Sequence, residues 1–184
     1  NPGDVVTVPK AYCKNMDWTG VTGVPRLNTS NSEVNIYGSI TMAPVGQMST
    51  YHYSDGINMR AGGTATIKSN GQYFYTLLVF QGSGTWSLLD DLNVLYVTHI
   101  RGEVNTKGKM VTVHSWWGNN SYPTGLANNN GAILRLGDPG SSSTVNITSQ
   151  FYCQYEPGKF FTEQSNLIIS DGAILVSQPF SHWA

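Results

Sequence analysis

The segment from Tyr73 to Trp117 constrains the fold of this chain more than any other stretch. It opens with Tyr73–Phe80, an unbroken apolar and aromatic run of strand length, which Gln81–Gly84 interrupts. Apolar residues then recur at helical spacing between Trp86 and Tyr96, and Lys109–Trp117 alternates again. This pattern predicts one short helix over 86–96, wedged between β-strands.

The rest of the chain predicts short strands separated by long loops. Alternating apolar positions between Val34 and Met42 predict a strand broken by Gly38, and Thr64–Lys68 and Val145–Tyr155 predict two more. Asn70-Gly71, just before the 73–80 run, is a hairpin signal. With one helix and no internal repeat, we expect an all-β fold: an antiparallel β-sandwich of the jelly-roll type, forming a single domain over residues 1–184.

Two short motifs within the central segment have structural explanations. Gly82-Ser83-Gly84 leads toward the predicted helix, but a phosphate-binding glycine fingerprint and a Walker lysine are absent, so a flexible loop is expected. Asp90 and Asp91 would point apart on a helix and could not act as an acid/base pair. They fit the electrostatics of a helix start.

No pattern of catalytic or metal-binding residues stands out. The four histidines do not fall at ligand spacing, and no serine lies in a recognisable nucleophile elbow. We therefore expect no enzymatic activity, no cofactor and no metal. The histidines are His52, His99, His114 and His182.

The low charge of the chain indicates the kind of surface it presents. Charged residues make up 11% of the sequence, the net charge is −1, and the cations are scattered rather than clustered. A nucleic-acid groove would need clustered cations, and no apolar stretch reaches membrane-spanning length. A polar, hydrated but uncharged surface of Asn, Ser, Thr, Gln and Gly is typical of extracellular proteins, viral shells and sugar-binding faces.

Aromatic residues are the candidates for binding or subunit contact. Trp116 and Trp117 are adjacent in a predicted strand, so they should point to opposite faces, one buried and one exposed or at an interface. The outer ring could stack on a sugar or pack against another subunit. The full candidate set is Trp116, Trp117, Tyr122, Trp183, Tyr51 and Tyr53.

The two cysteines, Cys13 and Cys153, lie far apart in sequence. They could form a disulfide that closes a long loop and stabilises the fold by about 4–5 kcal/mol. They could equally be two buried free thiols, and the sequence leaves both alternatives open.

The order of these patterns resembles that of capsid proteins of the picorna-like viruses. The resemblance rests on Tyr73–Phe80, on the predicted helix Trp86–Tyr96 followed by Arg101-Gly102, and on the late strand Val145–Tyr155 with Phe160-Phe161 after it. It implies a jelly-roll subunit of an icosahedral shell, with other capsid subunits as partners and the virion as location.

A binding module is the alternative reading of the same residues. Amide side chains in the Asn-rich loop 118–130 can hydrogen-bond sugar hydroxyls, and an exposed Trp can stack on a sugar ring. Such a chain would be an extracellular or cell-surface domain, such as the tip of a pilus adhesin or a phage tail fibre. It would bind a host receptor or glycan. A surface protein that makes only protein–protein contacts is a third hypothesis.

Overall fold

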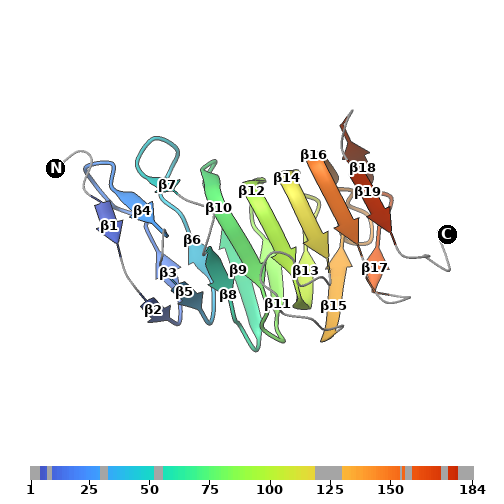
Figure 1. Ribbon diagram of the computed structural model, residues 1–184, viewed down its shortest axis with the longest axis horizontal. Helices are drawn as coiled ribbons and strands as arrows, with labels where there is room; N and C mark the ends of the chain where they lie inside the picture. The colour runs from blue at the N-terminus through green and yellow to red at the C-terminus, as the bar shows by residue number, and fades with distance from the viewer. Residues whose placement is uncertain are drawn as a thin grey trace.

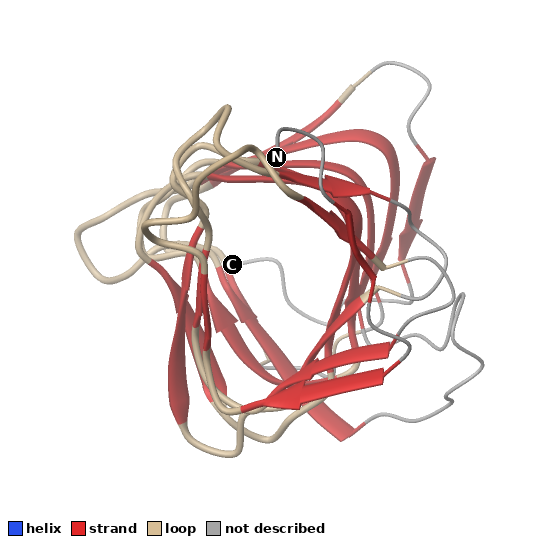
Figure 2. Cartoon of the chain, turned by 90° about the vertical axis from the view of Figure 1, so that its left-hand side faces the viewer, coloured by secondary structure: helices blue, strands red, loops and turns tan. Residues whose placement is uncertain are grey.

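The computed structural model describes residues 5–7, 10–29, 33–51, 56–118, 130–153, 155, 159–170 and 174–177. Throughout this part of the chain, every named element is a β-strand, and the strands pair in parallel (Figure 1). The chain winds in successive coils that stack along one axis, which defines a β-solenoid (Figure 2). The described residues include no helix that is long and apolar enough to cross a membrane.

Three parallel sheets form the walls of the solenoid. The first sheet is short and belongs to the N-terminal coils: β1 (Val5–Thr7), β4 (Arg26–Asn28) and β7 (Ser49–Tyr51).

The second sheet runs nearly the full length of the molecule and carries the longest strands. It contains β2 (Lys10–Cys13), β5 (Glu33–Ile36), β8 (Ile57–Met59), β10 (Tyr73–Phe80), β12 (Leu92–His99), β14 (Val111–Gly118), β16 (Thr144–Cys153), β18 (Asn166–Ile169) and β19 (Ile174–Ser177).

Each strand of the third sheet follows a strand of the second sheet along the chain. The third sheet contains β3 (Met16–Asp17), β6 (Ile40–Thr41), β9 (Thr64–Lys68), β11 (Thr85–Leu88), β13 (Arg101–Asn105), β15 (Asn130–Arg135) and β17 (Phe160–Phe161).

The strand β10 joins the first two sheets into one wall. Its beginning lies beside β7, where the Thr50 hydroxyl donates to Tyr73 O (3.3 Å) and accepts from Tyr75 N (2.7 Å). Its end pairs with β8 from Leu78 to Phe80. At the other end of the molecule, β16 pairs with β18 through its first half and with β19 through its second half. The central coils therefore have one long strand where the terminal coils have two.

The core consists of inward side chains that stack from coil to coil. One column of aligned residues joins Val34, Ile57, Leu78, Val97, Trp116 and Phe151, and all six are buried. A column in the third sheet joins Ala65, Trp86, Val104 and Leu134. Because period-2 alternation places every second residue inside, each strand contributes to columns that remove apolar surface from water along the whole axis.

The predicted antiparallel jelly-roll sandwich is wrong. The strands at 64–68, 73–80 and within 109–117 are present, but they pair in parallel with strands of neighbouring coils rather than as hairpins. Asn70-Gly71 joins β9 to β10, which belong to different sheets, so no hairpin forms there. Residues 34–42 form two strands in different sheets rather than one. The resemblance to jelly-roll capsid proteins thereby loses its structural basis.

The predicted helix over 86–96 is also wrong. Its residues form β11, a turn and β12. Asp90 accepts the backbone N–H of Ser69 (2.7 Å) and Asn70 (2.6 Å), and Asp91 accepts that of Met110 (2.9 Å). The two aspartates therefore join the corners of neighbouring coils and do not stabilise a helix start.

Candidate functional site

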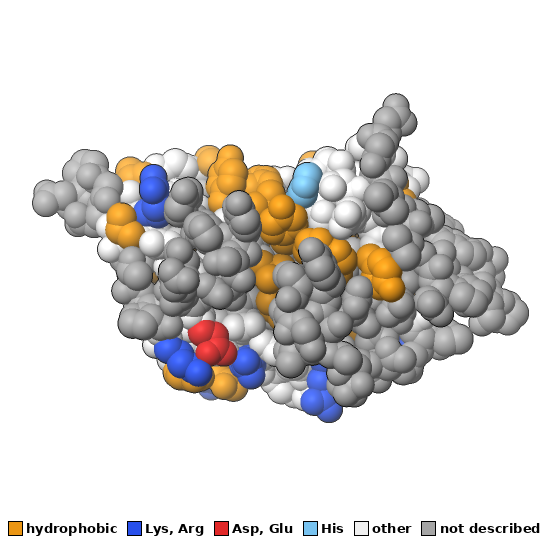
Figure 3. Space-filling view, in the orientation of Figure 1, with side chains coloured by type: hydrophobic (Ala, Val, Ile, Leu, Met, Phe, Trp, Pro, Cys, Tyr) orange, Lys and Arg blue, Asp and Glu red, His pale blue; other side chains and the backbone are white. Residues whose placement is uncertain are grey.

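An aromatic surface covers the outward side of the central coils. We call it the outer aromatic face. Phe74, Leu78 and Phe80 of β10 point into the core, so the alternate residues Tyr75, Leu77 and Val79 point outward, and the aligned strands alternate in the same way. In Figure 3, hydrophobic side chains gather over the middle of this side of the molecule. The face comprises Tyr73 and Tyr75 on β10, Tyr96 on β12, His114 and Trp117 on β14, and Tyr152 on β16.

The register of the parallel strands places these rings against one another. Val79, Thr98, Trp117 and Tyr152 are aligned across four strands. The ring centroids of Tyr96 and Trp117 lie 5.4 Å apart at 33°, and those of Tyr96 and His114 lie 5.6 Å apart in an edge-to-face arrangement. Neighbouring strands are about 4.8 Å apart, and we call the rings of β10, β12, β14 and β16 the aromatic ladder, although they do not form one aligned row: Tyr96, for example, is aligned with Leu77 and Ser115.

Apolar side chains support the ladder from beneath. Leu77, Val79, Ile100 and Trp117 form a buried cluster of their own, separate from the main core, with Tyr96 and Tyr152 packed against it. This second hydrophobic cluster therefore holds the rings of Tyr96, Trp117 and Tyr152 in position.

The rings differ in how far they reach solvent. Tyr75 is 56% exposed, whereas Trp117 is only 7% exposed. Tyr73 is half-buried and packs 4.2 Å from Tyr75, centroid to centroid. Burial raises the pKa of Tyr73, and the neighbouring Tyr75 and Tyr96 raise it further. The phenol hydroxyl of Tyr73 is therefore neutral at physiological pH and available as a donor.

The predicted binding residues are distributed differently from the expectation. Trp116 and Trp117 do point to opposite faces, but Trp116 lies in the main core and Trp117 is almost covered on the outer face, so neither offers an exposed ring. Tyr51 ends β7, and its side chain lies outside the described part of the chain. Tyr53, Tyr122 and Trp183 also lie outside the described residues.

The two cysteines occupy the same sheet but distant coils. Cys13 ends β2 and Cys153 ends β16, with five other strands between them. At about 4.8 Å per strand this separation is close to 29 Å, far more than a disulfide can span. Cys13 is a free thiol, and burial raises its pKa.

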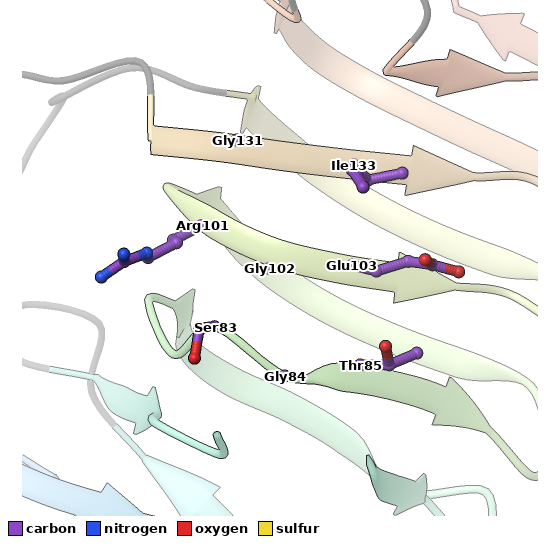
Figure 4. Close-up of a pocket in the computed structure, with 8 residues that line it drawn as sticks. All are labelled: Ser83, Gly84, Thr85, Arg101, Gly102, Glu103, Gly131 and Ile133. Carbon is purple, nitrogen blue, oxygen red and sulfur yellow. The ribbon is translucent and has the colours of Figure 1, made fainter. Parts of the chain in front are cut away.

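A groove of about 190 Å³ lies at the corner between the second and third sheets. We call it the corner groove. Its floor is a column of three glycines from successive coils: Gly84, Gly102 and Gly131 (Figure 4). Arg101 and Ser83 lie on one side of this column. Thr85, Glu103 and Ile133, which are aligned in register, lie on the other.

A buried polar network lies inside the solenoid, near the same corner. The Nε2–H of His99 donates to Gly102 O (3.0 Å), so Nδ1 must accept from the Tyr155 hydroxyl (2.9 Å). The Tyr155 oxygen in turn accepts from Trp116 Nε1 (3.1 Å). His99 is fully buried, and this burial lowers its pKa to about 4, so the imidazole is neutral.

The described residues contain no cluster of three or more His, Cys, Asp or Glu side chains that could hold a metal ion. Within those ranges, the features suited to ligand contact are the outer aromatic face and the corner groove.

Sequence reasoning overlooked the exposed rings of the outer aromatic face, although a signal was present. Tyr73 and Tyr75 are two residues apart within a strand, a spacing that places both on one face. The run 73–80 is apolar and aromatic throughout, so the pattern alone does not separate its outward rings from its buried side chains. Tyr96 and His114 gave no such signal, because their neighbours on adjacent coils are distant in sequence.

Comparison of the chain with protein-family models, with curated proteins and with solved structures finds no match in any of the three.

Proposed function

We propose that this protein is a carbohydrate-binding β-solenoid whose ligand lies along the outer aromatic face. The observation that carries the proposal is the ladder of rings from four consecutive strands, with Tyr75 open to solvent. Aromatic rings pack against the apolar C–H faces of sugars, and their polar ends hydrogen-bond the surrounding hydroxyls.

The polar residues around the rings support the same ligand class. The strand segments 73–79, 93–98, 112–117 and 146–152 contain no Asp, Glu, Lys or Arg. They do contain Asn, Thr, Ser, Gln and His, which can donate to and accept from hydroxyls. His114, for example, already hydrogen-bonds the Thr148 hydroxyl at 3.2 Å. A surface of this composition suits a neutral, hydroxyl-rich partner.

The shape of the face favours an extended ligand. The rings come from neighbouring strands, which are about 4.8 Å apart, so they are spread along the axis of the solenoid. An oligosaccharide that runs along the ladder can engage several rings at once, and the weak individual contacts then add up. The role is that of an extracellular recognition module. The capsid role stays a prediction, but the antiparallel jelly roll that the resemblance implied for it is not the fold of this chain.

A glycan array with the purified protein tests this proposal, followed by titration calorimetry on the best ligand. Truncation of the accessible ring in Tyr75→Ala should weaken binding by about tenfold, which corresponds to about 1.4 kcal/mol. Tyr37→Ala is the matched control because Tyr37 is also a half-exposed tyrosine, at 49%, but lies outside the outer aromatic face. Its binding should equal that of the wild type.

Two results would contradict the proposal. One is an array with no bound glycan at concentrations up to the millimolar range. The other is glycan binding that Tyr75→Ala and Tyr96→Ala leave unchanged. That result would show that the glycan binds outside the outer aromatic face.

A further inference from the structure

We infer that the corner groove binds the carboxylate of an acidic sugar within the glycan that the outer aromatic face holds. This inference rests on the proposed function and specifies its substrate class. Three features of the groove support it: the shape of its floor, the charges at its sides, and its position in the chain directly after the cluster that contains Trp117.

The floor of the groove is kept free of side chains by the geometry of the corner. Gly102 has a φ of +77°, and a Cβ atom there would lie 2.5 Å from Gly84 O and 2.8 Å from Trp86 Cζ3. A side chain at this position is therefore excluded by both backbone conformation and space. With glycines on three successive coils, the floor extends over two strand spacings, or about 10 Å.

Arg101 supplies a positive charge that no carboxylate of the described residues neutralises. Of the other arginines, Arg60 is paired with Glu33 (3.3 Å) and Arg135 with Glu163 (3.0 Å). Within the described ranges Arg101 makes no ion pair, and its side chain is exposed and extends to one side of the glycine floor (Figure 4). A guanidinium in this state is suited to bidentate contact with a carboxylate.

The one carboxylate of the groove, Glu103, is directed away from this cation. Glu103 and Arg101 extend in opposite directions in Figure 4. Glu103 Oε1 accepts from Arg135 Nε at 3.4 Å, and Arg135 also packs over the Phe161 ring. Glu103 is therefore partly neutralised. Its carboxylate can accept hydrogen bonds from sugar hydroxyls across the floor, and the Thr85 hydroxyl beside it can both donate and accept them.

The groove and the outer aromatic face are adjacent in the chain. Ile100 belongs to the cluster that supports Trp117, and Arg101 is the next residue. The inference therefore requires an oligosaccharide long enough to reach from the exposed Tyr75 ring, past this buried cluster, to the groove.

The test uses one sugar in two forms: a tetrasaccharide containing glucuronate, and the same tetrasaccharide with its carboxyl groups reduced to alcohols. The wild type should bind the acidic form about tenfold more tightly at low salt, and added salt should reduce this preference. Arg101→Gln should abolish the preference, whereas Arg101→Lys should keep part of it. Lys68→Gln is the control, since it removes an exposed cation from another strand of the same sheet.

The outcomes separate this inference from the proposed function. Equal binding of both forms by the wild type, unchanged in Arg101→Gln, overturns the acidic-sugar inference alone. If neither form binds, and the glycan array is also empty, the outer aromatic face is not a glycan site and both statements fall. Circular dichroism and thermal unfolding of Arg101→Gln show whether this exposed substitution leaves the fold intact.

Discussion

His99 shows how a single residue links the walls of the solenoid. Its two ring nitrogens are both engaged, one with the corner backbone at Gly102 and the other with Tyr155. Gly118 makes room for this arrangement, because a Cβ atom there would lie 2.5 Å from the Tyr155 ring. The neutral Nε2–H tautomer is the only one that satisfies both partners, so a second proton on Nδ1 would remove an acceptor from a buried hydroxyl.

The protonation of His99 predicts how stability depends on pH. In the unfolded chain a histidine takes up a proton near pH 6.5, but folded His99 takes one up only near pH 4. Between pH 6.5 and pH 4 the unfolded state thus binds more protons than the folded state. The contribution of neutral His99 to the free energy of unfolding is therefore complete above pH 6.5 and is lost as the pH decreases toward 4. The loss should reach about 2 kcal/mol at pH 5 and about 3 kcal/mol at pH 4. Urea unfolding between pH 7.5 and 5 measures the slope.

Variants can assign the slope to this residue. His99→Asn should flatten it, and His114→Gln, which replaces a histidine outside the buried network, is the control. The window above pH 5 also avoids Asp17, Glu33 and Asp138, whose pKa values are lowered by their hydrogen bonds. A wild-type slope that persists in His99→Asn would contradict the assignment.

At the scale of the element, the corners decide where strands begin and end. The apolar residues of the segment 86–96 have helical spacing, but the segment is not a helix. It consists of the end of β11, a three-residue corner and the start of β12. Leu88 and Leu92 point into the core, but Leu89 between them is half exposed at the corner. A helix would have placed all these leucines on one face. Local periodicity cannot reveal a corner whose hydrogen-bond partners, Ser69 and Asn70, lie some twenty residues earlier.

The corner glycines supply a matched pair of substitutions. Gly102 and Gly131 have nearly the same φ, +77° and +73°, but only Gly102 is closely surrounded by other atoms. Gly131→Ala should cost about 1 kcal/mol of stability through the backbone conformation alone. Gly102→Ala should cost clearly more, by about 1–3 kcal/mol, because its Cβ meets the backbone oxygens of Gly82 and Gly84, just before β11, and the Trp86 ring. Denaturant unfolding of both variants gives the difference. Equal losses would mean that the corner is less tightly packed than the distances indicate.

For the whole molecule, stacking makes each coil depend on its immediate neighbours. The central strands β10, β12 and β14 each contain eight residues, and each has a strand on both sides. By contrast, β3 and β6 near the N-terminal end contain two residues each. In such an array, stability is approximately a sum of contributions from each coil and from each contact between neighbouring coils.

This unequal distribution predicts graded hydrogen exchange. Backbone amides of β10, β12 and β14 should exchange most slowly, and those of β3 and β6 much faster, because the end coils can open without the centre. Exchange measured by mass spectrometry on native protein gives the profile. Uniform protection along the chain would instead indicate one cooperative unit.

The amino-acid sequence by itself determined that the chain is rich in β-strands, where several of them lie, and which alternate residues could be buried, as in β10 and β14. Only the tertiary structure decided which strands pair, in what direction, and where the chain turns. The reason is physical: alternation with a period of two is the same in parallel and antiparallel sheets, and the backbone hydrogen bonds that distinguish them join residues about twenty positions apart. The outer aromatic face and the corner groove exist only through that stacking, because their side chains come from successive coils.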